Sequence, residues 1–252
     1  MQRLTKDVIQ WIKNQVPEDG KAIIGISGGK DSTITAALCV EALGADRVIG
    51  VMMPNGAQAD IADSAQVCSI LGIESHLIDI AVAYNNISMD IARSFCANDE
   101  QPLCTVWNNK MFTTNTPARL RMVTLYAVAA LYPNSRVVNT CNYSEDYVGY
   151  STKYGDAAGD FSPLGGFTVR EVLAIGDDLG LPYELVHKTP SDGMCGKTDE
   201  DNLGFTYEQL DNYIDGDVSL VPDAVVERIE HLHAATRHKY RQIPTYIVRE
   251  EY

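Results

Sequence analysis

Residues 22–32 read AIIGISGGKDS, and this stretch decides the fold class. The apolar run at residues 22–26 predicts a buried strand, and the Ser-Gly-Gly that follows predicts a tight turn. Residues 32–43 then show apolar side chains at helical spacing, and Gly44 predicts the end of that helix. The stretch therefore predicts a strand, a glycine turn and a helix in direct succession.

The same alternation continues along the chain. Residues 48–53 and 75–80 predict two further strands, and residues 59–71 predict a helix between them. Residues 117–131 predict an amphipathic helix with a proline in its first turn, and residues 135–140 predict a fourth strand. Strands that alternate with helices predict a doubly wound, mostly parallel α/β sheet with helices on both faces.

Two polar segments rich in turn formers interrupt this alternation, at residues 98–115 and 189–202. Long polar connections in a compact domain are often functional lids. We therefore expect both segments to be surface loops that can close over a site.

Composition narrows the range of functions. The 252 residues carry 20 Lys and Arg against 34 Asp and Glu, which gives a net charge of −14. This charge disfavours nucleic acid and membrane surfaces as partners, because both are polyanions, but it allows small anions at a local site. Six cysteines without a CxxC pair predict reduced thiols rather than disulfides or a metal site. No targeting or membrane-spanning segment is visible, so we expect a cytoplasmic protein.

The turn after the first strand has the composition of a phosphate-binding loop. Ligands of open α/β sheets bind at the carboxyl ends of the strands, where this turn lies. Its two glycines allow successive backbone N–H groups to point at an anion, and Ser27, Ser32 and Lys30 add hydroxyl groups and positive charge. Asp31 adds a hard oxygen ligand that suits Mg²⁺. The turn therefore predicts a site for a magnesium-bound polyphosphate.

Two commoner phosphate loops do not match these residues. Ile24 stands where a Walker loop needs glycine, and Asp31 stands where it needs Ser or Thr. A GxGxxG pattern counted from Gly25 fails as well. A glycine-rich turn without a ligand is the remaining alternative, but the combination of strand, SGGKDS and helix is much rarer than a pair of glycines.

SGGKDS after a first strand resembles the loop of the ATP pyrophosphatase (PP-loop) superfamily, whose members cleave ATP between its α and β phosphates. Further stretches, in their order, resemble ammonia-dependent NAD synthetase: NTPARLRM at 115–122, SEDYVGYSTKYGDAAGD at 144–160, TDEDNLGFTYEQLD at 198–211 and RHKYRQIP at 237–244. The resemblance implies an adenine nucleotide α-hydrolase-like fold, with residues 1–252 as one synthetase domain and no glutaminase domain. It also implies a homodimer that amidates deamido-NAD with ammonia and ATP, through an adenylated intermediate, and releases NAD, AMP and pyrophosphate.

The resemblance assigns roles to individual residues. The ATP-binding residues would be Gly25, Ile26, Ser27, Gly28, Gly29, Lys30, Asp31, Ser32, Thr140 and Ser191. The residues that bind deamido-NAD would be Arg119, Lys153, Asp160, His238 and Lys239. Asp31 and Glu145 would bind Mg²⁺ as the cofactor, and Lys30 and Asp156 would be the catalytic residues. An aspartate near the ammonia position makes chemical sense, because ammonium must lose a proton before it attacks.

Simpler interpretations of these residues stay open. Glu145 also fits a surface glutamate on a short helix, and its neighbour Asp146 has only that interpretation. The polar residues of the Gly/Ala-rich segment 152–160 fit a solvated loop. Arg119 and Arg121 are two apart on a predicted helix, so they point to different faces and cannot easily reach one group.

The chain departs from the family pattern at Val169, where a lysine that contacts ATP is usual, and Arg170 follows as a candidate replacement. Two other functions fit the glycine loop alone. A PP-loop sulfur transferase or tRNA-modifying enzyme would need a basic RNA-binding face, which the net charge disfavours. A non-catalytic nucleotide-binding module would not need residues for a second substrate.

Overall fold

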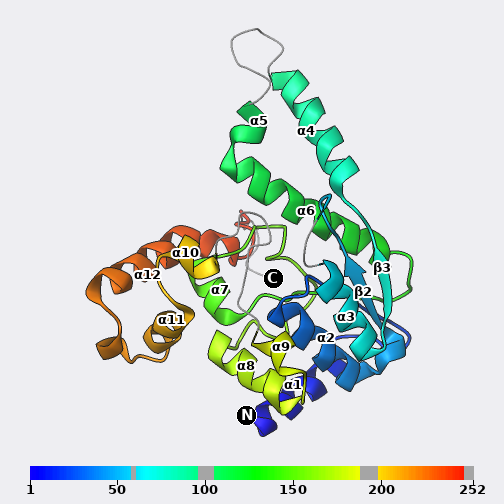
Figure 1. Ribbon diagram of the computed structural model, residues 1–252, viewed down its shortest axis with the longest axis horizontal. Helices are drawn as coiled ribbons and strands as arrows, with labels where there is room; N and C mark the ends of the chain where they lie inside the picture. The colour runs from blue at the N-terminus through cyan, green and yellow to red at the C-terminus, as the bar shows by residue number, and fades with distance from the viewer. Residues whose placement is uncertain (58–60, 96–104, 188–197, 247–252) are drawn as a thin grey trace.

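A four-stranded parallel sheet lies at the centre of the structure (Figure 1). The computed structural model describes residues 1–57, 61–95, 105–187 and 198–246. The strands are β1 (Ala22–Gly25), β2 (Val48–Met52), β3 (Glu74–Leu77) and β4 (Arg136–Val138), in the spatial order β3-β2-β1-β4. All neighbouring pairs are parallel, which confirms the predicted sheet. Because β1 pairs with both β2 and β4, the loop after β1 lies at the middle of the sheet's carboxyl edge.

Side chains of β1 alternate between two cores, as a strand buried on both faces requires. Ile24 belongs to the core formed with α1 (Gln2–Lys13), α2 (Lys30–Leu43), α3 (Ile61–Leu71) and α8 (Val169–Asp178). Ile23 belongs to the other core, where α6 (Lys110–Ala129) packs on the sheet. Helices therefore cover both faces of the sheet, as predicted.

Most of the remaining helices form two groups (Figure 1). Two of them, α4 (Ala81–Phe95) and α5 (Thr105–Asn108), extend with α6 away from the sheet as an arm. Others gather beside the carboxyl edge of the sheet and contribute to a third core: α7 (Tyr143–Val148), α10 (Asp199–Leu203), α11 (Tyr207–Ile214) and α12 (Asp223–Thr236). The short α9 (Tyr183–Val186) instead packs against α2 and α8, in the core that contains Ile24. The described ranges also hold the 3₁₀ helices η1 (Ala45–Arg47), η2 (Val218–Leu220) and η3 (Arg237–Lys239).

The predicted start of one helix was wrong. The helix expected from Pro117 begins at Lys110, where the side chain of Asn109 caps it by accepting a hydrogen bond from the backbone N–H of Phe112. Pro117 is buried within the helix, because packing against the neighbouring helices outweighs its missing N–H group.

The two segments expected to be loops are partly helical. Residues 105–115 belong mostly to α5 and α6, and α10 follows Thr198, whose hydroxyl caps it. Residues 96–104 and 188–197 lie outside the described residues. No helix in the described ranges combines the length and hydropathy needed to cross a bilayer.

Candidate active site

The loop between β1 and α2 is built to present N–H and hydroxyl groups. Gly28 has a φ of +79°, and a Cβ atom there would lie 3.0 Å from the backbone nitrogen of Ser64. The Ser27 and Ser32 hydroxyl groups are 3.1 Å apart, and the Ser27 oxygen also accepts the N–H of Gly29 at 3.2 Å. The loop leads directly into the first turn of α2, so backbone N–H groups and the helix dipole favour an anion there.

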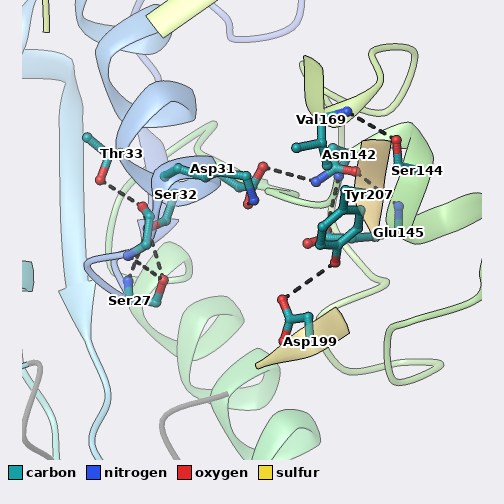
Figure 2. A network of polar contacts seen from close by, with 12 residues as sticks. Ser27, Asp31, Ser32, Thr33, Asn142, Ser144, Glu145, Val169, Asp199 and Tyr207 are labelled. Atoms are coloured by element: carbon teal, nitrogen blue, oxygen red, sulfur yellow. Dashed lines mark hydrogen bonds and ion pairs between the residues drawn. The ribbon is translucent and has the colours of Figure 1, made fainter. Parts of the chain in front are cut away.

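Two carboxylates meet beside this loop because each lies in the first turn of a helix (Figure 2). Asp31 belongs to α2 and Glu145 belongs to α7. Asn142 caps α7: its side chain accepts the Glu145 N–H at 3.0 Å, while Glu145 accepts the Asn142 N–H at 3.3 Å. The amide of Asn142 also donates to Asp31 Oδ1 at 3.0 Å. One asparagine therefore positions both carboxylates.

A cavity of about 220 Å³ connects the loop, the two carboxylates and the segment after α7. Its lining residues are Ser27, Gly29, Asp31, Ser32, Thr140, Cys141, Glu145, Tyr150 and Asp156. Loop residues, both candidate metal ligands, Thr140 and Asp156 thus face one space. Gly25 and Ile26 instead lie within β1 and in the core, where they support the loop from behind.

The electrostatics of this cavity are unfavourable without added positive charge. Burial raises the pKa of Glu145 well above its ordinary value, and the neighbouring Asp31 raises it further. Burial acts to lower the pKa of Lys30, but Asp31, Glu145 and Asp199 outweigh it and the pKa is raised. Such an acidic cavity favours a polyphosphate that enters together with a cation.

The donor set suits a hard divalent cation. Both facing groups are carboxylates, and Mg²⁺ is typically held by one or two carboxylates together with substrate phosphates and water. Within the described ranges no three His, Cys, Asp or Glu residues cluster as a complete metal cage. The residues therefore fit a metal that arrives with a nucleotide better than a resident structural metal.

A second group of residues surrounds the loop after α7. Arg119 Nε donates to the backbone carbonyl of Lys153 at 3.1 Å, and Lys153 Nζ donates to that of His238 at 2.9 Å. Lys239 Nζ donates to two carbonyls of the same loop, at 2.7 and 2.6 Å. Four of the five residues predicted for the second substrate are thus brought together, although they are distant in sequence.

Asp156 is placed between the two groups. Its Oδ1 atom accepts the Thr152 N–H at 3.0 Å, and its side chain is open to the cavity. The surrounding protein atoms nevertheless reduce its hydration, which raises its pKa, while Thr152 and Lys239 act in the opposite direction. A carboxylate with a raised pKa is a better base than an ordinary aspartate.

Asp160 lies apart from the other predicted substrate residues. One oxygen accepts the Tyr126 hydroxyl at 3.1 Å and the other accepts the Val137 N–H at 2.7 Å, so it connects α6 with β4. Ser191 lies outside the described residues.

Val169 stands where the family usually carries a lysine, and the structure shows whether Arg170, the next residue, takes that lysine's place. Val169 is buried in the third core. Arg170 donates to Oδ1 of Asn212 on α11 at 2.6 Å and to Oδ2 of Asp215, the C-cap of that helix, at 3.1 Å. It therefore binds α11 rather than replacing the missing lysine at the cavity.

Sequence reasoning missed several residues that shape the site. Asn142 had a readable signal, because Asn-x-x-Glu is the pattern of a capping box. Tyr207 had none: its ring lies 5.6 Å from Lys30 Nζ, and its hydroxyl approaches Asp199 (Figure 2). The surface interpretation of Asp146 was wrong, because its Oδ1 atom is buried and burial raises its pKa to about 6.

The fold and the cavity together define a class of protein. A glycine loop at the end of the first strand of a parallel sheet, with two carboxylates beside it, is a site for a metal-bound polyphosphate in a nucleotide-using α/β enzyme.

Comparison with known proteins makes this more specific. The family described as NAD synthase matches residues 4–244. The NH(3)-dependent NAD(+) synthetase of Alkaliphilus metalliredigens is 36% identical over 236 residues, which cover 92% of this chain and 93% of that relative. Among solved structures, the NMN synthetase from Francisella tularensis has a TM-score of 0.82 at 32% identity, covering 97% of each chain. The NH3-dependent NAD synthetase from Campylobacter jejuni has a TM-score of 0.73 at 26% identity, covering 98% of this chain and 99% of its own.

The chain belongs to the NAD synthase family. The resemblance inferred from the sequence is therefore confirmed. The predicted enzyme class, a C–N bond-forming, ATP-using ligase of ammonia-dependent NAD synthesis, is confirmed with it. These matches do not favour a sulfur transferase, a tRNA-modifying enzyme or a non-catalytic module. ATP use in this family is consistent with a requirement for a divalent metal.

Proposed function

We propose that the chain converts deamido-NAD to NAD in two steps within the cavity described above. A nicotinate carboxylate oxygen attacks the α-phosphorus of ATP, and the bond to the β-phosphate oxygen breaks to release pyrophosphate. Ammonia then attacks the carbonyl carbon of the acyl-adenylate, loses a proton and displaces AMP. The activation is needed because a carboxylate is a poor electrophile, whereas the mixed anhydride carries AMP as a good leaving group.

One observation carries this proposal: the phosphate loop, the Asp31–Glu145 pair and Asp156 line a single cavity. The first two suit departure of pyrophosphate, and the third suits delivery of ammonia. A nucleotide-binding module would need the loop but would have no reason to place a base in the same space.

The loop and Lys30 would stabilise the negative charge that develops on the leaving pyrophosphate. Backbone N–H groups and the hydroxyl groups of Ser27 and Ser32 are held in place by their mutual hydrogen bonds. Such fixed donors need no reorganisation during the reaction, which is the main source of electrostatic catalysis. Thr140, at the carboxyl end of β4, and Ser191 are proposed as further ATP contacts.

Asp31 and Glu145 would hold Mg²⁺ against the phosphate oxygens. When bound, the ion would neutralise phosphate charge and polarise the phosphorus–oxygen bonds. The capping box at Asn142 keeps both carboxylates directed at the cavity, so this chain supplies a preformed pair of oxygen ligands.

Asp156 would accept a proton from ammonium next to the acyl-adenylate. The Thr152 N–H holds its Oδ1 atom, so the carboxylate keeps a defined orientation. Arg119, Lys153 and the pair His238–Lys239 would bind the phosphates of the second substrate from the adjacent loop. Their present partners are backbone carbonyls, which a pyrophosphate could replace.

The direct test is a pyrophosphate-release assay with Mg·ATP, ammonium and deamido-NAD. We expect release of pyrophosphate that depends on deamido-NAD, and NAD formed in equal amount when ammonium is present. Glutamine in place of ammonium should support little NAD formation, because an amide nitrogen is not nucleophilic. ATP binding without any pyrophosphate release would contradict the proposal and favour the non-catalytic module.

A second acceptor is favoured by one specific observation. The solved structure with the TM-score of 0.82 is described as an NMN synthetase, and the match covers 97% of this chain. Nicotinate mononucleotide carries the same reacting carboxylate as deamido-NAD but lacks the adenylate half. Comparison of kcat/KM for the two acceptors decides between them: a higher value for the mononucleotide would move the assignment to NMN synthesis.

We also propose a homodimer that forms through the arm of α4, α5 and α6. The arm extends from the sheet and exposes large apolar side chains, among them Val82 at 72%, Phe95 at 81%, Met111 at 70% and Val123 at 65%. Such exposed apolar surface typically marks a protein interface. Val123→Glu should shift the sedimentation coefficient from dimer to monomer, whereas an unchanged dimer would exclude this face. A single domain over residues 1–252, the lack of a glutaminase domain and a cytoplasmic location stay predictions.

A further inference from the structure

A buried lysine stands where positive charge is most needed. Lys30 lies in the first turn of α2 and is only 6% exposed. Its Nζ atom is 2.8 Å from Asp31 Oδ2 and 5.6 Å from the centre of the Tyr207 ring. A lysine at this position of a phosphate loop has the length to reach solvent or a ligand, but here it folds back onto the carboxylates.

The carboxylates around Lys30 are the ones assigned to the metal. Besides Asp31, both Glu145 and Asp199 act on the Lys30 charge. Asp199 is in turn held by the Tyr150 hydroxyl at 3.1 Å and approached by the Tyr207 hydroxyl at 3.5 Å. Asp31 Oδ1 accepts the amide of Asn142 and Oδ2 accepts Lys30 Nζ, so a cation that binds Asp31 through Oδ2 would compete with Lys30.

We propose that Lys30 holds the place of the divalent cation while the site contains no nucleotide. Its ammonium group neutralises the carboxylates, and it transfers to the phosphate oxygens when the metal–nucleotide complex enters. This inference rests on the proposed function, which assigns Asp31 and Glu145 to the metal.

The consequence is a coupling between metal and nucleotide. A free divalent cation must displace Lys30 from Asp31 and leave a buried ammonium group without its partner, which weakens binding of the metal alone. A nucleotide offers the displaced ammonium new anionic partners, so metal and nucleotide bind more tightly together than separately. Arg170 cannot take this role, because Asn212 on α11 and Asp215 at its C-cap bind its guanidinium group.

The test measures Mn²⁺ binding rather than turnover. Free Mn²⁺ is titrated by electron paramagnetic resonance, with and without α,β-methylene-ATP, whose α–β linkage is not cleaved. Lys30→Met removes the charge and keeps the length of the side chain. Lys21→Met is the matched control, since Lys21 precedes β1 and pairs with Glu74 at the start of β3 through a 3.6 Å contact, away from the cavity.

We expect Lys30→Met to bind Mn²⁺ alone at least about tenfold more tightly than the wild type, and its gain from the nucleotide to fall by a similar factor. Lys21→Met should match the wild type both in its affinity for Mn²⁺ alone and in the gain of affinity that the nucleotide gives. Equal or weaker Mn²⁺ binding by Lys30→Met would overturn the inference. So would a wild-type protein that binds Mn²⁺ as tightly without the nucleotide as with it, a result that needs no variant.

Two further measurements keep the outcomes distinct. If Lys30→Met does not fold, Lys30→Gln keeps a polar end and is expected to show the same tightening. Asp31→Asn separates this inference from the proposed function: if it leaves Mn²⁺ binding in the presence of nucleotide unchanged, the metal assignment itself is wrong. If Asp31→Asn weakens that binding while Lys30→Met does not tighten Mn²⁺ binding, only the role of Lys30 is wrong.

Discussion

Replacing Asp211 with alanine should destabilise the junction of three helices that supports Glu145. Asp211 is 1% exposed on α11, and its Oδ1 atom accepts the hydroxyl of Ser144 on α7 at 2.5 Å. Its Oδ2 atom accepts the backbone N–H of Arg170 in the first turn of α8 at 2.8 Å. The Ser144 oxygen also accepts the Val169 N–H at 3.1 Å, so one carboxylate joins α7, α8 and α11 (Figure 2 shows the contact of Ser144 with Val169).

The expected cost follows from the donors that lose their acceptor. Asp211→Ala leaves the Ser144 hydroxyl and the Arg170 N–H without a partner in a buried place, and each such group costs about 1–3 kcal/mol. We therefore expect the free energy of unfolding to fall by about 2–4 kcal/mol. This is a large part of the total stability of an ordinary domain.

The loss of unfolding free energy caused by Asp211→Ala should depend on pH in a defined direction. Burial raises the pKa of Asp211 above its ordinary value, even though Ser144 and Arg170 act to lower it. The folded protein therefore holds the Asp211 proton more tightly than the unfolded chain, and wild-type stability falls as pH rises from the ordinary carboxyl pKa through the raised one. Alanine has no such titration, so the deficit of the variant should be larger at the acidic end of this window than above it.

The assay is urea unfolding followed by circular dichroism at several pH values. Asp215→Ala is the control, because its side chain is 53% exposed and its contact with Arg170 is exposed as well. If Asp211→Ala differs from this control by less than about 0.5 kcal/mol, the reasoning from buried hydrogen bonds is refuted.

Three further variants test the site. Asp31→Asn should reduce kcat by about 100-fold or more while the protein stays folded, because one charge is lost at the metal site; wild-type turnover at limiting Mg²⁺ would contradict this. Asp156→Asn should lower the rate most at neutral pH and least at alkaline pH, where free ammonia is abundant, and a pH-independent defect in the rate profile would remove its role as a base. Lys153→Ala should raise the KM for deamido-NAD and leave the affinity for ATP nearly unchanged. If calorimetry showed lost ATP affinity and unchanged deamido-NAD affinity, the assignment of the ATP and deamido-NAD subsites would be reversed.

The phosphate loop could be predicted from sequence because its determinants are local. Strand, glycines, hydroxyl groups and helix follow one another within residues 22–43, and each has its own signature. The parallel sheet followed from the rhythm of strands and helices alone. Pro117 misled the boundary of α6, because a proline is a helix-start signal only where tertiary packing does not hold it in the interior.

The assembly of the site could be predicted only through resemblance. Asn142 and Asp31 are 111 positions apart, and they meet because β4 pairs beside β1. Local patterns carry no information about which strand pairs with which. The same holds for the folding back of Lys30 onto Asp31 and for the burial of Asp146, which depend on how α7, α10 and η3 pack around the carboxyl edge of the sheet.

The most direct measurement follows an oxygen label through the reaction. Deamido-NAD labelled with ¹⁸O in both carboxylate oxygens is incubated with Mg·ATP and ammonium. The ¹⁸O content of NAD, AMP and pyrophosphate is then measured by mass spectrometry. If the carboxylate attacks the α-phosphorus and ammonia displaces AMP, each NAD formed is accompanied by one AMP that carries one ¹⁸O, and pyrophosphate carries none. Label in pyrophosphate, or AMP without label while NAD accumulates, would contradict the adenylation mechanism.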